Sequence, residues 1–322
     1  MTRTTTMEAQ EQEALAEEAL FQLQVLNLGD GKQKEKGKEI DPSRTELAQI
    51  DHDNDNDHDH DHGGGGYDDE SSLLPSFDEL EEILGYKFKN KSLLEEAFTD
   101  SSYPEKHFSY ERLEYVGDSV LNLLFTKEQF FMYPDLPPGA LTRLRSANVN
   151  TEKLARVAIK LGLHRYLRHK KPVLEEQIRE FSAEILNYPL HSNGLVDVPK
   201  ALADIVESAA GAVFIDSNSS VETVWKVFRP LLEPIISLET IKLHPVTELY
   251  EVCQKKNLKV KFVDLWKEST AFNVFVEDQL VGRGSYGLKK EIAHNRAAKD
   301  ALNNIKKFLT DHEKENHAPL IN

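Results

Sequence analysis

The chain has little that could crosslink it or anchor it in a membrane. Its 322 residues include one cysteine, Cys253, which excludes an internal disulfide and a small cystine-stabilised secreted domain. No apolar run approaches about 18 residues, as a membrane-spanning helix requires, and glutamates interrupt residues 1–30, where a signal peptide needs an apolar core. We therefore expect a soluble intracellular protein of the nucleus or the cytoplasm, with no membrane partner.

Basic residues are outnumbered, because 39 Lys and Arg stand against 55 Asp and Glu, for a formal net charge of −16. The imbalance is local: the residues up to Pro75 include 19 acidic and 6 basic side chains and account for −13 of the charge. The net charge thus does not exclude a polyanionic partner for the rest of the chain. The Asp/His alternation at 51–62 and the glycines after it are typical of low complexity, so we expect residues 1–75 to form a disordered acidic leader.

Helical patterns follow the leader. Apolar residues recur at helical spacing on either side of an expected turn at 85–89. Further along, Asn150 and Thr151 predict a helix start and Gly162 a helix stop. We expect an all-α domain over 76–237.

The pattern changes after this domain. The order becomes one helix, three short strands in KVKFVDLWKE, AFNVFVED and QLVGRGSY, and a long final helix. This predicts a second domain of the α+β class, α-β-β-β-α, over 243–309. The polar residues 310–322 are expected to be a frayed tail.

Acidic side chains interrupt two strongly apolar helical segments. In ERLEYVGDSVLNLLF, Glu111, Glu114 and Asp118 fall at i, i+3 and i+7 and line one stripe of a helix. In PKALADIVESAAGAVFID, Asp204 and Glu207 stand at i and i+3. If the stripes meet, their oxygens suit Mg²⁺ or Mn²⁺ rather than zinc, because no His or Cys is interspersed. The spacing alone leaves a second interpretation open, in which both stripes are solvated faces.

The same segments carry a resemblance to a known family. ERLEYVGDSVL closely resembles the signature of the ribonuclease III family, and LADIVESAAGAVFID resembles its second acidic motif. GYKFKNKSLLEEAFTDSS is similar to the family's first helices, and LTRLRSANVNTEKLARVAIKLGL is most similar to plant ribonuclease III-like proteins with one catalytic domain. The resemblance covers about residues 77–237.

This resemblance implies a double-strand-specific endoribonuclease of RNA processing or small-RNA pathways. Such an enzyme hydrolyses phosphodiesters with two metal ions, Mg²⁺ or in its place Mn²⁺, and needs no nucleotide cofactor. Its products would carry 5′-phosphates, 3′-hydroxyls and two-nucleotide 3′ overhangs. Because one acidic cluster cuts one strand and the chain has one catalytic domain, a homodimer is also implied.

The family's site residues can be carried over to matching positions. The positions that match metal ligands are Glu114, Asp118, Asp204 and Glu207. Asp118 and Glu207 would lie closest to the chemistry, and Glu111 would be a supporting acid. Lys200 matches a lysine of eukaryotic members, and it is expected either to neutralise the scissile phosphate or to be a solvated lysine at a helix start.

Two positions depart from the family's pattern in the catalytic domain. Pro138 stands where bacterial members have a glutamate, which puts one auxiliary acid in doubt. Asp100 stands where the family commonly has histidine. We expect this second change to alter local hydrogen bonding without abolishing activity.

The α-β-β-β-α region resembles the double-stranded-RNA-binding domain, which recognises A-form shape through phosphate and 2′-hydroxyl contacts. The resemblance implies RNA contacts at Glu251, Lys289, Lys290, His294 and Arg296. Because Glu291 and His294 replace the lysines usual in the family, binding should be weaker and less dependent on salt. Two alternatives to an active nuclease remain: a catalytically silent double-stranded-RNA-binding protein, and an adaptor of a silencing complex, which is favoured only if the altered helix abolishes RNA binding.

Overall fold

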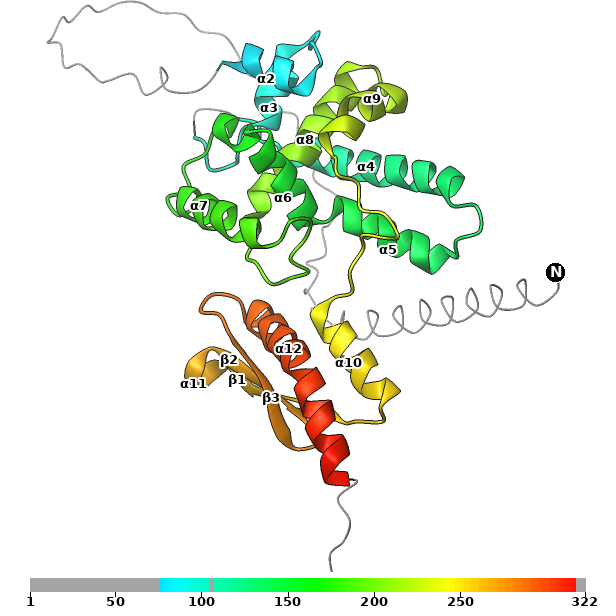
Figure 1. Cartoon of the computed structure of the whole chain (residues 1–322). Helices are drawn as coiled ribbons and strands as arrows, with labels where there is room; N and C mark the ends of the chain where they lie inside the picture. Colours follow the sequence, from blue (N-terminus) through cyan, green and yellow to red (C-terminus); the bar gives the residue numbers. More distant parts are fainter. Residues whose placement is uncertain (1–75, 105–106, 317–322) are drawn as a thin grey trace, which may run out of the picture.

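The computed structural model describes residues 76–104 and 107–316, so the leader expected at 1–75 lies outside the described residues. The first part of the described chain is helical, as expected (Figure 1). Its helices are α2 (Phe77–Leu84), α3 (Lys91–Ala97), α4 (Glu111–Met132), α5 (Pro138–Val149), α6 (Thr151–Lys160), η2 (Leu163–Tyr166), α7 (Leu174–Glu184), η3 (Ile185–Asn187), α8 (Lys200–Asp216) and α9 (Val221–Leu231).

Local signals explain several of these boundaries. The Asn150 side chain accepts a hydrogen bond from the Lys153 backbone N–H at 2.9 Å and caps α6, which confirms the predicted start. Gly162 follows the same helix with φ +70°, a left-handed conformation that glycine adopts without strain. Pro138 occupies the first position of α5, where a missing N–H costs nothing.

Helix α8 runs through the core of this part and is buried along most of its length. Its backbone meets that of α4 directly. A Cβ atom on Gly117 of α4 would lie 1.7 Å from the Glu207 carbonyl oxygen, and one on Gly211 of α8 would lie 2.1 Å from the Leu113 carbonyl oxygen. Since neither position can hold a larger residue without a shift of main chain, contact between the two backbones sets the separation of the two acidic stripes.

The second part of the described chain has the expected helix-sheet-helix order. Its elements are α10 (Pro245–Lys255), β1 (Val260–Leu265), α11 (Trp266–Ser269), β2 (Ala271–Val276), β3 (Gln279–Ser285) and α12 (Lys290–Asn316). The three strands are antiparallel in the order β1-β2-β3, and α12 lies across one face of the sheet (Figure 1). Each part has its own cluster of buried hydrophobic residues.

One predicted strand boundary in this part was wrong. The first strand ends at Leu265 instead of running through WKE, because the Asp264 carboxylate accepts from the Trp266 N–H at 2.9 Å and a short helix begins there. The final helix continues to Asn316, beyond the expected domain end at residue 309, and fraying of residues 310–322 stays a prediction. Residues 310–316 are polar, but they contain neither Gly nor Pro to end the helix.

Within the described residues, no helix is both long and apolar enough to cross a membrane. Cys253 is a free cysteine on α10 and only 1% exposed. Burial raises the pKa of its thiol to about 11. The side chain therefore stays protonated at neutral pH and packs as a small apolar group.

Candidate active site

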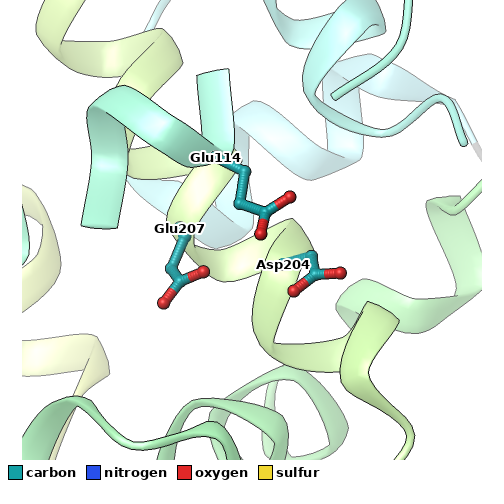
Figure 2. Close-up of side chains that lie close together, drawn as sticks. All are labelled: Glu114, Asp204 and Glu207. Atoms are coloured by element: carbon teal, nitrogen blue, oxygen red, sulfur yellow. The ribbon is translucent and has the colours of Figure 1, made fainter. Parts of the chain in front are cut away.

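Three carboxylates meet where α4 packs against α8. Glu114 lies in the first turn of α4, and Asp204 and Glu207 lie one turn apart on α8; each offers an oxygen, and these oxygens lie within 4.8 Å of one another (Figure 2). Asp204 is buried and the two glutamates are half-buried. Clustered carboxylate oxygens are the donors that hard divalent cations such as Mg²⁺ prefer, so the residues present fit such an ion.

The two other acids of the first stripe line the same cavity of about 360 Å³. Asp118 is exposed, and one of its oxygens accepts a hydrogen bond from the Asn122 side-chain amide at 2.8 Å. Glu111 is also exposed, with Ser109 Oγ donating to it at 3.3 Å. The structure thus brings three of the four predicted ligands into a compact group and places Asp118 and Glu111 beside it.

Burial and mutual repulsion raise the pKa values of two carboxyl groups of this cluster. Burial, together with the nearby carboxylates of Asp118, Asp204 and Glu114, raises the pKa of Glu207 to about 8. Burial and Glu114 also raise the pKa of Asp204, although Lys200 opposes them. A cation among these groups would relieve the repulsion that raises both pKa values.

Lys200 supplies a positive charge from the chain itself. It is the first residue of α8, and its Nζ lies 2.8 Å from Glu114 Oε1 and 2.5 Å from Asp204 Oδ1. Burial lowers the pKa of this ammonium, but its hydrogen bonds to the two carboxylates outweigh burial and raise it. Lys200 therefore pairs with two carboxylates of the site and is fully protonated at neutral pH, although its side chain is 69% exposed, and its contact with a scissile phosphate stays a prediction.

Sequence patterns did not identify two further residues at this site. The Tyr110 hydroxyl lies 3.2 Å from Asp204 Oδ2, and Thr151, from the first turn of α6, lines the cavity. Tyr110 immediately precedes the conspicuous ERLE segment, so its position was the one available signal. Thr151 reaches the site only through packing of a distant helix, which no local pattern reports.

Two of the predicted RNA-contacting residues bind the helical part of the chain. Lys289 Nζ lies 2.6 Å from an Asp197 carboxylate oxygen. Arg296 pairs with Glu184 at 3.2 Å and donates to the Leu195 carbonyl oxygen at 3.0 Å. The basic residues at the start of α12 thus contact the end of α7 and the segment between α7 and α8.

The other three predicted residues have contacts within the C-terminal part. Lys290 pairs with Asp264 at 2.5 Å. The His294 ring packs against Phe262, with ring centroids 4.2 Å apart, and burial lowers its pKa, so it is neutral at neutral pH. Glu251 is only 8% exposed. Contact of these residues with RNA stays a prediction.

Comparisons with known proteins agree with the resemblance of the motifs. A family model for the ribonuclease III domain matches residues 111–218. The chain is 52% identical over 240 residues to Ribonuclease 3-like protein 3 of Oryza sativa subsp. japonica, a match that covers 73% of this chain and 80% of that protein. It is 46% identical over 256 residues to Endoribonuclease Dicer homolog 1 of Arabidopsis thaliana, covering 76% of this chain but only 13% of that protein.

A solved structure of the nuclease domain of ribonuclease III from Campylobacter jejuni also matches. The identity is 29% and the TM-score 0.39, and the match covers 50% of this chain and 98% of that domain.

Proposed function

The chain belongs to the ribonuclease III family and is a ribonuclease, and we propose that it cleaves double-stranded RNA with divalent cations held at its acid cluster. The observation that carries the proposal is the convergence of Glu114, Asp204 and Glu207, with oxygens within 4.8 Å of one another. Asp118 lines the same cavity and is the fourth proposed ligand. Mg²⁺ is the proposed ion, with Mn²⁺ able to replace it.

Divalent cations in such a site supply Lewis-acid polarisation of the phosphate and a water of lowered pKa. The chain's own residues would bind the cations and compensate the negative charge of the phosphate. Three half-buried or buried carboxylates from two helices offer oxygens at fixed positions. Lys200, on the edge of the same cavity, can exchange a carboxylate partner for a phosphate oxygen of the substrate. The proposed products carry 5′-phosphates, 3′-hydroxyls and two-nucleotide 3′ overhangs.

We propose a homodimer formed through the helical part. Tyr115, Leu123 and Phe130 on α4 are 77%, 54% and 65% exposed. Their spacing of eight and seven residues places them on one face of the helix, so they form an apolar stripe on the surface. An exposed apolar stripe beside a catalytic cluster favours burial against a second copy. Light scattering should give twice the chain mass of 36.6 kDa, and a strict monomer at micromolar concentration would contradict the dimer.

We also propose that residues 243–309 bind duplex RNA. The support is the α-β-β-β-α order and the run of Lys and Arg at the start of α12. The replacement of expected lysines by Glu291 and His294 weakens this binding. A silent RNA-binding protein is the alternative to an active nuclease, and the acids that line the cavity argue against it.

A cleavage assay separates the candidates. The full chain is incubated with a long RNA duplex in Mg²⁺, beside Glu207→Gln and beside an EDTA control. We expect cleavage by the wild type in Mg²⁺ alone, with overhanging ends visible on sequencing the products. If neither protein cleaves while both bind the duplex, the nuclease is ruled out and the RNA-binding function stands.

A further inference from the structure

Tyr110 sits behind the acid cluster, immediately before α4. It is 5% exposed, and its hydroxyl lies 3.2 Å from Asp204 Oδ2 and 3.2 Å from Asp100 Oδ2. A phenol has one proton to donate, so it can satisfy only one of two ionised carboxylates at a time. Which of them receives the proton depends on the other partners of each carboxylate.

Asp100 is supplied with donors of its own. It is 1% exposed, Lys171 Nζ lies 2.6 Å from its Oδ2, and the Ser102 N–H donates to its Oδ1 at 2.9 Å. Burial raises the pKa of this carboxyl, but its bonds to Lys171 and Ser102 outweigh burial and lower it. The backbone N–H of Asp100 donates to the Arg168 carbonyl oxygen at 2.9 Å, which links Asp100 to the segment that contains Lys171. Asp100 is thus ionised and has donors of its own, so the Tyr110 proton is left for Asp204.

Asp204 is the carboxylate that needs the hydroxyl proton. Its Oδ1 faces Lys200 at 2.5 Å, while its Oδ2 faces Tyr110. Donors on the two oxygens fix the plane and the rotamer of this buried side chain. When Lys200 turns toward a substrate, Tyr110 is the remaining donor that holds the carboxylate in place.

We propose that Tyr110 is a positioning residue that orients Asp204 for binding of a divalent cation, because Lys171 and Ser102 satisfy Asp100 and leave the hydroxyl proton to Asp204. The inference rests on the proposed function, since it assigns Asp204 to the cation site. It also gives a role to the aspartate that replaces the histidine usual at position 100: this aspartate faces the Tyr110 hydroxyl but takes its own hydrogen bonds from Lys171 and Ser102. Tyr110 acts only as a hydrogen-bond donor, and its proton stays on the phenol oxygen.

The test compares Tyr110→Phe with Tyr166→Phe in the full chain. Tyr166 is a matched control, because it is 4% exposed and its hydroxyl also donates to a carboxylate at 3.2 Å, that of Glu79, away from the acid cluster. Mn²⁺ binding without RNA is measured by titration calorimetry, and folding by thermal denaturation. We expect Tyr110→Phe to bind Mn²⁺ about 10- to 100-fold more weakly, as loss of an outer hydrogen bond to a ligand does, and Tyr166→Phe to bind as the wild type does.

Equal Mn²⁺ affinity in Tyr110→Phe and the wild type would overturn the inference, as would an equal loss in Tyr166→Phe. If Tyr110→Phe does not fold, Lys171→Gln replaces it, because Lys171 is 44% exposed and the glutamine amide can still donate to the buried Asp100 carboxylate. A weaker loss of Mn²⁺ affinity is then expected, because Asp100 competes with Asp204 for the hydroxyl proton, and no loss refutes the proposal. Failure of the proposed function gives a different result, in which the wild type neither binds Mn²⁺ nor cleaves duplex RNA.

Discussion

Lys200 Nζ lies 2.8 Å from Glu114 Oε1, so an ammonium joins the first turn of α8 to the first turn of α4 across the acid cluster. This contact predicts that removal of the lysine strengthens cation binding but slows RNA cleavage. Without the lysine, the carboxylates lose a competitor and should bind Mg²⁺ more tightly. A phosphate at the site would lose a compensating charge, so catalysis should slow.

Lys200→Gln should therefore lower both the half-saturating Mg²⁺ concentration and kcat, the latter by about 10- to 100-fold. Single-turnover cleavage over a range of Mg²⁺ concentrations measures both quantities. Lys200→Arg keeps the charge and is the control. An unchanged kcat in Lys200→Gln would show that the lysine only pairs with the carboxylates of the metal-free site and does not contribute to catalysis.

Glu207 predicts a pH dependence of cation binding. Because its pKa is raised to about 8, it holds a proton at pH 7 that a bound cation must displace. Apparent Mg²⁺ affinity should rise from pH 6 to pH 8, with net proton release at pH 7. Calorimetry in two buffers of different ionisation enthalpy measures the release, and Glu207→Gln should release fewer protons. Release equal to that of the wild type would contradict the assignment.

The same shift predicts how the metal-free protein responds to pH. A carboxyl whose pKa is higher in the folded chain than the ordinary value of 4.5 stabilises the fold fully below that value. This contribution is lost as the pH rises through about 8. Urea unfolding in EDTA should therefore show the wild type losing stability between pH 5 and pH 8, and Glu207→Gln losing less. A parallel decline in both proteins would assign the effect to other groups.

Gly117 offers a test of the helix contact. Its Cβ would overlap the Glu207 backbone, so Gly117→Ala must separate α4 from α8. We expect the melting temperature to fall by roughly 5–10 °C, from about 2–3 kcal/mol of overpacking. Mn²⁺ affinity should fall as well. Gly287→Ala is the control, since a Cβ at that position meets nothing within 4 Å. Equal melting temperatures for the two variants would contradict the close contact.

The basic start of α12 gives a prediction about RNA affinity. Lys289 and Arg296 pair with Asp197 and Glu184 of the helical part, so duplex RNA must compete with those carboxylates. The double variant Asp197→Asn/Glu184→Gln should bind duplex RNA about 3- to 10-fold more tightly, as expected when phosphate-binding cations are freed. Filter binding at several salt concentrations measures the change.

The control for this experiment is Asp78→Asn/Glu176→Gln, which removes the same charge from surface pairs with Lys91 and Arg179. If both double variants gain affinity equally, the effect is one of net charge. Competition at α12 is then not its cause.

Local patterns in the sequence predicted much of this molecule. The helical spacing of apolar residues and the Asn150 cap correctly located helices, and the i, i+3 and i+7 spacing correctly placed three acids on one face of α4. Spacing could not show that the face meets α8, because that contact depends on Gly117 and Gly211 opposing each other across the fold. The resemblance to a known family supplied that step.

Contacts between distant segments explain what sequence patterns missed. Lys289 and Arg296 look like free phosphate ligands in sequence, yet their partners lie about a hundred residues away, at the end of α7 and in the segment that follows it. Trp266 was assigned to a strand because of its type, while the preceding Asp264 side chain turns the chain into a helix. Neither the ion pairs nor this hydrogen bond produces a periodic pattern in the sequence.

The direct backbone contact of α4 with α8 also bears on which parts of the chain can open. Amide hydrogens near Gly117 and Gly211 are shielded by main chain on the facing helix, and α8 is buried along most of its length. We expect such amides to exchange with solvent only when the domain unfolds as a whole. The acid cluster would then lie on a slowly exchanging unit of the protein, and a rearrangement that admits a duplex would occur around it.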